Sequence, residues 1–162
     1  MTYQENYQKW VDFTGLPDYL RQDLENMDEK TKEDAFYTNL EFGTAGMRGL
    51  IGAGTNRINI YVVRQATEGL ARLIESKGGN EKDRGVAIAY DSRHFSPEFA
   101  FESAAVIAKH GIKSYVFESL RPTPELSFAV RHLNCFAGIM ITASHNPAPF
   151  NGYKVYGEDG GQ

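Results

Sequence analysis

Ser144 and Lys154 are the two residues whose types and spacing could do chemistry together. Ser144 follows the apolar run 136–142 with His145 beside it, and Lys154 comes ten positions after Ser144. The prolines and glycine between them could turn the chain back on itself. A serine hydroxyl is a poor nucleophile unless a base assists it or charge stabilises its product, and a nearby lysine could exchange a proton or pair with a phosphate. The alternative interpretation is a turn whose polar side chains cap backbone groups.

Two further segments carry groups that suit an anion. Residues 91–94 (Asp-Ser-Arg-His) follow an apolar segment, and the fork-shaped guanidinium of Arg93 matches a phosphate. Residues 43–49 hold Thr44, Arg48 and three glycines, so exposed backbone N–H groups could cradle an anion there. The glycine segment matches neither G-x-x-x-x-G-K-[ST] nor G-x-G-x-x-G, so it is not a standard nucleotide-binding loop. Both segments are also compatible with plain surface turns.

Helical and strand patterns alternate around these three segments. Apolar runs predict strands at 86–90, 112–117, 136–142 and 153–156. Glycine stops and proline-containing first turns predict helices at 60–77, 96–111 and 123–134. The alternation favours an α/β fold, which we predict to be a three-layer α/β/α arrangement with a mixed, largely parallel sheet. Ligands of such sheets lie beyond the carboxyl ends of the strands, where we expect the three segments to meet.

The ends of the chain differ from this pattern. Residues 1–38 show apolar side chains at helical spacing, and we predict peripheral N-terminal helices whose aromatic residues pack in a core. Residues 39–162 would then form the domain that carries the chemistry. The chain finishes with GEDGGQ, in which glycines and acidic residues follow no closing helix. We therefore expect a fragment of a longer protein.

Composition argues against several classes of function. The 162 residues include 17 basic and 21 acidic ones, mixed along the chain without a basic run, so we expect no nucleic-acid partner. No apolar stretch approaches the ~20 residues that cross a membrane, and the polar N-terminus is unlike a signal peptide. Cys135 is the only cysteine, which suits a reducing compartment, and we predict a cytoplasmic protein. No cysteine–histidine cluster has zinc spacing.

Three motifs carry a resemblance to a known family. FGTAGMRG at 42–49, YDSRH at 90–94 and TASHNPAPFNGYKVYGEDGGQ at 142–162 occur in this order. From about residue 40 onward the sequence resembles the α-D-phosphohexomutase superfamily, and within it the bacterial phosphoglucomutase and phosphopentomutase branch. The resemblance implies that residues 39–162 are the first, phosphoserine-bearing domain of a four-domain isomerase of carbohydrate metabolism, and that the chain ends before domains II to IV.

The resemblance also implies roles for residues. Ser144 would be carried as phosphoserine and pass its phosphoryl group to the free hydroxyl of a hexose phosphate. The resulting glucose 1,6-bisphosphate would reorient and return its other phosphate to the serine. Lys154 would be the general acid/base, with Arg48 and His145 assisting. The residues implied to line the site or to bind phosphate and substrate are Thr44, Arg93, Asn146 and Asn151.

The family resemblance implies a metal that this chain cannot hold by itself. Mg²⁺ would bind one oxygen of the phosphate on Ser144, and its other ligands would come from an aspartate-rich loop of the absent second domain. The sugar-selecting and distal phosphate-binding domains would be absent as well. We therefore expect the chain alone to show negligible interconversion of glucose 1-phosphate and glucose 6-phosphate, with the remaining domains of the same polypeptide as its partners.

Other functions stay open at the level of sequence. A phosphopentomutase or phosphomannomutase would use the same mechanism, because the residues that read the sugar lie outside this chain. A non-catalytic phosphosugar-binding module is a second alternative, although Ser144, Lys154 and Arg48 are all intact. A serine hydrolase built on Ser144 and His145 is disfavoured, because the G-x-S-x-G elbow is missing.

Overall fold

The computed structural model describes residues 1–44 and 46–162 and places a five-stranded sheet at the centre, in the order β1-β5-β4-β2-β3. The strands are β1 (Met47–Leu50), β2 (Val86–Tyr90), β3 (Ser114–Val116), β4 (Ala137–Ile141) and β5 (Phe150–Tyr156). β4, β2 and β3 pair in parallel, whereas β5 pairs antiparallel with both β4 and β1. Within the described part of the chain, β5 alone runs against the other strands. This confirms a mixed, largely parallel sheet.

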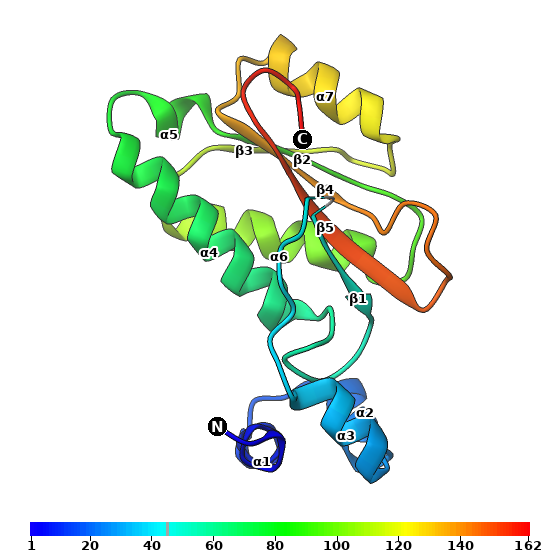
Figure 1. Ribbon diagram of the computed structural model, residues 1–162. Coiled ribbons are helices and arrows are strands. Elements are labelled where there is room, and N and C mark those ends of the chain that lie inside the picture. Colours follow the sequence, from blue (N-terminus) through cyan, green and yellow to red (C-terminus); the bar gives the residue numbers. More distant parts are fainter. Residues whose placement is uncertain (45) are drawn as a thin grey trace.

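Helices cover both faces of the sheet (Figure 1). α4 (Ile60–Lys77) and α6 (Ser96–Lys109) lie on one face, over a core that includes Ile88, Ile139 and Tyr153. α7 (Thr123–His132) lies on the other face against β2 and β4, over the small residues Ala87 and Ala89. Because successive strand residues point to opposite faces, each buried strand supplies both cores, which explains its unbroken apolar sequence. The predicted α/β/α layering is confirmed.

The N-terminal helices form a third cluster at one end of the molecule, away from α7 (Figure 1). They are α1 (Tyr3–Asp12), α2 (Asp18–Glu25) and α3 (Glu29–Phe36). Thr2 begins α1 with a capping box, in which its side chain and that of Glu5 satisfy each other's backbone N–H groups. Leu20, Leu24 and Phe36 are fully buried within this cluster, together with Ala53 from the segment after β1. The aromatic residues of α1 therefore pack against a core, as predicted.

Three local features differ from the sequence prediction. The glycine segment 43–49 was interpreted as an anion cradle or a surface turn, but β1 begins inside it, at Met47. The segment at 43–46 therefore leads into a strand instead of following one. It still reaches the predicted edge, since Met47 and Ile141 pair with the same residue of β5. β5 itself begins at Phe150, three residues earlier than predicted. The short α5 (Glu81–Arg84) was not predicted either.

α6 begins at Ser96, and Phe95, with a φ of 66°, takes the cap position before it. None of the helices in the described residues has the length and apolar character needed to span a bilayer.

Candidate active site

Ser144 lies three residues beyond β4, at the carboxyl edge of the sheet, in an unusual backbone conformation. Its φ is 54°, in the left-handed region that residues with a Cβ rarely adopt. Holding a residue there costs about 1–3 kcal/mol, so the surrounding structure must enforce it. Ala143 before it is buried, and the Ser144 N–H donates to Oγ1 of the buried Thr142 over 3.0 Å. The side chain of Ser144 is consequently fixed at the edge while remaining exposed.

Lys154 contacts the Ser144 hydroxyl directly. Its Nζ donates to Ser144 Oγ over 2.8 Å. Lys154 lies in the middle of β5, opposite Met140 of β4, and is 9% exposed. Burial, and then the positive charge of Arg48, lower the pKa of Lys154 below its usual range. A lysine with a lowered pKa exchanges a proton more readily near neutral pH, as general acid/base catalysis requires.

Arg48 reaches the same loop from β1. It pairs with Gly152, two residues before Lys154, so the two cations lie on the same face of the sheet. Arg48 Nη1 donates to Oδ1 of Asn146 over 3.0 Å. The Arg48 Nε is buried and has no hydrogen-bond partner among the described residues. Arg48 thus offers an unused donor close to the loop that carries Ser144.

The approach of the glycine segment to β5 depends on Gly46. Gly43 and Gly46 exchange two backbone hydrogen bonds, of 2.9 and 3.1 Å. Gly46 has a φ of 89°, and a Cβ there would lie 2.6 Å from the Tyr153 carbonyl and 3.0 Å from Cγ of Lys154. Only glycine therefore fits this close approach. Thr44 is exposed beside it, and Ala45 lies outside the described residues.

Arg93 has a different environment from the one we predicted. All four N–H groups of its two terminal nitrogens donate to backbone carbonyls of residues 144–150. No terminal N–H is left for a phosphate in this geometry, although Arg93 lines the pocket that contains Ser144. Binding of phosphate or substrate by Arg93 stays a prediction. In a sequence, an arginine that binds phosphate looks the same as an arginine that holds a loop. Carbonyl and phosphate oxygens both accept hydrogen bonds from a guanidinium.

Asn151 also does not face the site. Its side chain is fully buried, donates to Ser96 Oγ and the His94 carbonyl over 2.9 and 3.0 Å, and accepts from the Gly152 N–H. We predicted a contact with substrate or phosphate, but Asn151 joins β5 to the start of α6 instead. The neighbouring Asp91 accepts from Ser96 Oγ over 2.7 Å. The sequence did not predict this buried network, because no sequence pattern reveals which groups a single amide side chain will hydrogen-bond.

An open pocket lies beside Ser144. It has a volume of about 450 Å³ and is lined by Asp91, Ser92, Arg93, His94, Ser144, Asn146 and Ala148. His145 is exposed and is not among the lining residues. The segments after β2 and β4 thus meet at one cavity, as expected for the carboxyl edge of the parallel strands.

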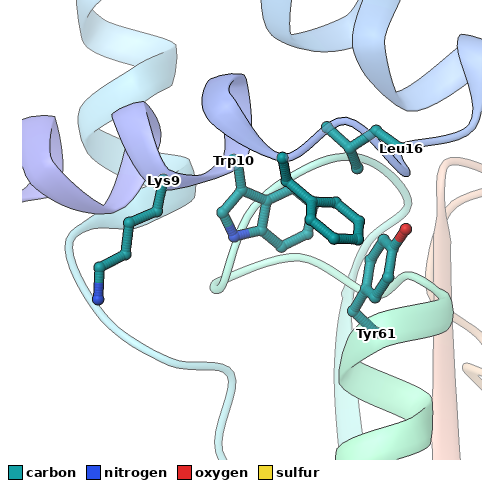
Figure 2. A pocket seen from close by; sticks show the side chains of 5 residues that line it. Lys9, Trp10, Leu16 and Tyr61 are labelled. Atoms are coloured by element: carbon teal, nitrogen blue, oxygen red, sulfur yellow. The ribbon is translucent and has the colours of Figure 1, made fainter.

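A second pocket, of about 330 Å³, lies between α1 and the start of α4 (Figure 2). The aromatic rings of Trp10, Phe13 and Tyr61 line it together with Leu16, and Lys9 points along its margin. Its amine and hydroxyl, on Lys9 and Tyr61, make no hydrogen bond with each other, unlike Lys154 and Ser144. We therefore assign the candidate chemistry to the pocket at Ser144.

The described residues do not provide a metal site of their own. They contain no group of three or more histidine, cysteine, aspartate or glutamate side chains able to hold an ion. The group on Ser144 Oγ is the cation Lys154, whereas Mg²⁺ prefers carboxylate, carbonyl and phosphate oxygens. Among the described residues that line the pocket at Ser144, Asp91 supplies the one carboxylate. The residues present therefore do not hold a Mg²⁺ by themselves.

The arrangement suits a hydroxyl that carries a phosphoryl group. A phosphate on Ser144 would bring a charge of about −1.5 to −2 and three acceptor oxygens. Lys154 already donates to the Oγ, and Arg48 donates to Asn146 of the same loop. Cations positioned in this way stabilise the charge that develops during phosphoryl transfer.

Comparison with known proteins agrees with this geometry. Residues 39–162 match the family model for phosphoglucomutase/phosphomannomutase, alpha/beta/alpha domain I. A phosphoglucomutase of Staphylococcus epidermidis strain RP62A is 46% identical over 94% of this chain and 27% of its own length. A phosphoglucomutase of Staphylococcus aureus strain RF122 is 50% identical over 81% of this chain and 23% of its own.

A solved structure agrees as well. A phosphoglucomutase/phosphomannomutase family protein from Burkholderia thailandensis superposes with a TM-score of 0.62, at 25% identity over 73% of this chain and 26% of its own. The chain therefore spans about a quarter of the length of the relatives that it matches.

Proposed function

The chain belongs to the phosphoglucomutase/phosphomannomutase family, and we propose that it supplies the phosphoryl-carrying serine of an enzyme that interconverts glucose 1-phosphate and glucose 6-phosphate. The observation that carries this proposal is the 2.8 Å contact between Lys154 Nζ and Ser144 Oγ, made by a lysine whose pKa is lowered by burial. A hydroxyl paired with such a lysine can both accept and release a phosphoryl group.

Each half-reaction then forms one P–O bond and breaks another. In the first half-reaction, the free hydroxyl of the sugar phosphate attacks the phosphorus on Ser144, and its proton passes to water. The bond from phosphorus to Ser144 Oγ breaks, and Lys154 as an ammonium gives a proton to that oxygen. After the bisphosphorylated sugar reorients, Ser144 Oγ attacks its other phosphate while neutral Lys154 takes the hydroxyl proton. The bond from that phosphorus to the sugar oxygen breaks, and the sugar oxygen takes a proton from water. The enzyme ends phosphorylated, as it began.

The remaining side chains serve charge and position. Arg48 stabilises the transferring phosphoryl group through its positive charge, and Asn146 orients the Arg48 guanidinium. Thr44 and His145, both exposed at the edge of the site, contact the substrate or its phosphate. Phosphoryl transfer depends on such positioning and charge neutralisation more than on covalent help from the protein.

In this proposal the chain is one part of the site. Residues 39–162 act as the phosphoserine domain, with 1–38 as a helical extension, in the cytoplasm. Further domains of a longer polypeptide select the sugar, bind its distal phosphate and supply the other ligands of a Mg²⁺ that contacts the phosphoserine. The chain alone accordingly has negligible turnover. The relatives, about four times longer than the matched region, support this division.

Intact mass spectrometry of the full-length protein tests the proposal first. One added phosphate is expected on Ser144 after incubation with glucose 1,6-bisphosphate, and none on the Ser144→Ala variant. Label from the bisphosphate should then exchange into glucose 6-phosphate. If phosphate binds but its label never exchanges into glucose 6-phosphate, the protein is a phosphosugar-binding module and not a mutase. Rates on glucose, mannose and pentose phosphates separate the three mutase activities, and the proposal predicts the highest kcat/KM on glucose 1-phosphate.

A further inference from the structure

Arg93 crosses from the segment after β2 to the loop after β4 and binds that loop through its backbone. Nη1 donates to the carbonyls of Pro147 and Phe150 over 2.9 and 3.0 Å. Nη2 donates to the carbonyls of Ser144 and Asn146 over 2.9 and 2.6 Å. One planar guanidinium therefore joins four carbonyls within seven residues, and one of them belongs to Ser144.

Backbone hydrogen bonds also hold the loop, from the N–H groups of Asn146 and Phe150 to the carbonyls three residues earlier and from Ile51 to the Pro149 carbonyl. Pro147 and Pro149 themselves have no backbone N–H and donate none. Ser144 at the start of the loop has a left-handed φ, which a serine does not favour. The Arg93 side chain is 14% exposed, so its hydrogen bonds to the loop compete little with water.

Arg93 is itself fixed from behind. The Asp91 carboxylate accepts from the Arg93 backbone N–H over 3.0 Å and lies 3.5 Å from its Nε. The same carboxylate accepts from Ser96 Oγ, which in turn accepts from Asn151 of β5. The guanidinium is thus anchored to α6 and to the strand that carries Lys154, and the loop is held relative to both.

We propose that Arg93 is a positioning residue for phosphoryl transfer, which holds Ser144 in its left-handed conformation with Oγ against Lys154 and does not bind the sugar phosphate. The inference rests on the function proposed above. The inference goes beyond that function by giving Arg93 a role in binding the backbone of residues 144–150, where all terminal donors of Arg93 are used.

The test compares Arg93→Gln, Arg93→Lys and the control Arg72→Gln in the full-length protein. Arg72 is an exposed arginine of α4, 75% exposed in its side chain and paired only with Glu68 within the described residues. Steady-state kinetics on glucose 1-phosphate give kcat and KM. Phosphorus NMR follows the titration of the phosphate on Ser144, and amide hydrogen exchange compares residues 144–150 with α4.

For Arg93→Gln we expect kcat to fall at least ~100-fold, the loss that a displacement of about 1 Å can cause. KM should stay within about threefold. Arg93→Lys should not rescue kcat, because one ammonium with three donors cannot span four carbonyls. The phosphoserine should titrate closer to the usual pKa near ~6, and exchange should rise at residues 144–150 but not in α4. Arg72→Gln should match wild type.

Three results would overturn the inference. A KM raised more than tenfold with kcat near wild type, partly restored by Arg93→Lys, would show a direct phosphate ligand. A kcat of Arg93→Gln within twofold of wild type would show that positioning is unnecessary. Exchange that rises equally in the loop and in α4 would show general destabilisation. If wild type itself turns over no sugar phosphate, the proposed function fails, and local exchange at residues 144–150 alone decides whether Arg93 holds the loop.

Discussion

Replacing Gly46 with alanine should disturb the site through the backbone of β5. Gly46 has a φ of 89°, and an added Cβ would lie 2.6 Å from the Tyr153 carbonyl oxygen. Reaching an ordinary contact of 3.4 Å requires a shift of about 0.8 Å. The next nearest atom is Cγ of Lys154, at 3.0 Å, so the shift acts on the strand segment that positions the ammonium.

The cost can be estimated from two effects. A left-handed φ costs an alanine about 1–3 kcal/mol, and overpacking against backbone adds about 1–3 kcal/mol. We expect the free energy of unfolding to fall by about 2–6 kcal/mol, and Tm by roughly 4–24 °C for a domain of this size. A displacement approaching 1 Å at Lys154 should lower kcat of the full-length enzyme by up to ~100-fold.

Gly69→Ala is the matched control. Gly69 lies inside α4 with nothing within 4 Å of the position of an added Cβ. The same chemical change there should raise the free energy of unfolding by about 0.5–1 kcal/mol, because glycine is the poorer helix former. Urea denaturation of both variants gives the comparison. The reasoning is refuted if the free energy of unfolding of Gly46→Ala lies within about 0.5 kcal/mol of wild type, because a steric overlap with backbone should destabilise the fold by more than that.

Three further predictions concern single side chains. Lys154→Met should lower kcat by about 10²- to 10⁴-fold while raising the free energy of unfolding, because a buried cation beside another cation no longer opposes folding. His110 pairs with Glu68 and Glu75, which raise its pKa above 6.5. Its stabilising contribution should be complete below pH 6.5 and disappear as the pH rises through the raised pKa. The difference in free energy of unfolding between wild type and His110→Gln, measured by urea denaturation, should therefore decrease as the pH rises. Asn151→Ala should cost about 2 kcal/mol in denaturation, because it leaves buried groups without partners.

These three predictions fail under distinct outcomes. A Lys154→Met variant that melts lower than wild type would show that the ammonium stabilises the fold. A gap between wild type and His110→Gln that widens with pH would contradict the raised pKa of His110. An Asn151→Ala variant as stable as wild type would mean that water replaces the amide in the network.

The sequence was most informative where a pattern of residues is compatible with a single structure. The runs at 86–90 and 136–142 could be assigned to strands because a strand covered on both faces must be apolar throughout. β1 could not be predicted, since its four residues include a glycine and its only partner is β5, about a hundred residues later in the chain. Its existence depends on tertiary pairing and not on local preference.

For the site, the sequence identified the loops but not every contact. The pairing of Ser144 with Lys154 was anticipated from their spacing, and the structure brings them together. Arg93 was interpreted as a ligand because its donors suit phosphate, and Asn151 because the family resemblance implied it. Which acceptor a donor finds depends on the fold, and here backbone carbonyls and a serine lie closer. The roles of Thr44 and His145 remain predictions.

The alternation of side chains along β5 limits how the strand itself can change in length. Tyr153 points into the core between the sheet and α4, with its hydroxyl 2.8 Å from Thr67, while Lys154 faces the opposite side. One residue added or deleted between Gly152 and Lys154 would shift these two side chains onto each other's faces, with a tyrosine at the site or an ammonium in hydrocarbon. The loop before β5 carries no such constraint, because a longer loop absorbs an added residue without changing the pairing of the strands.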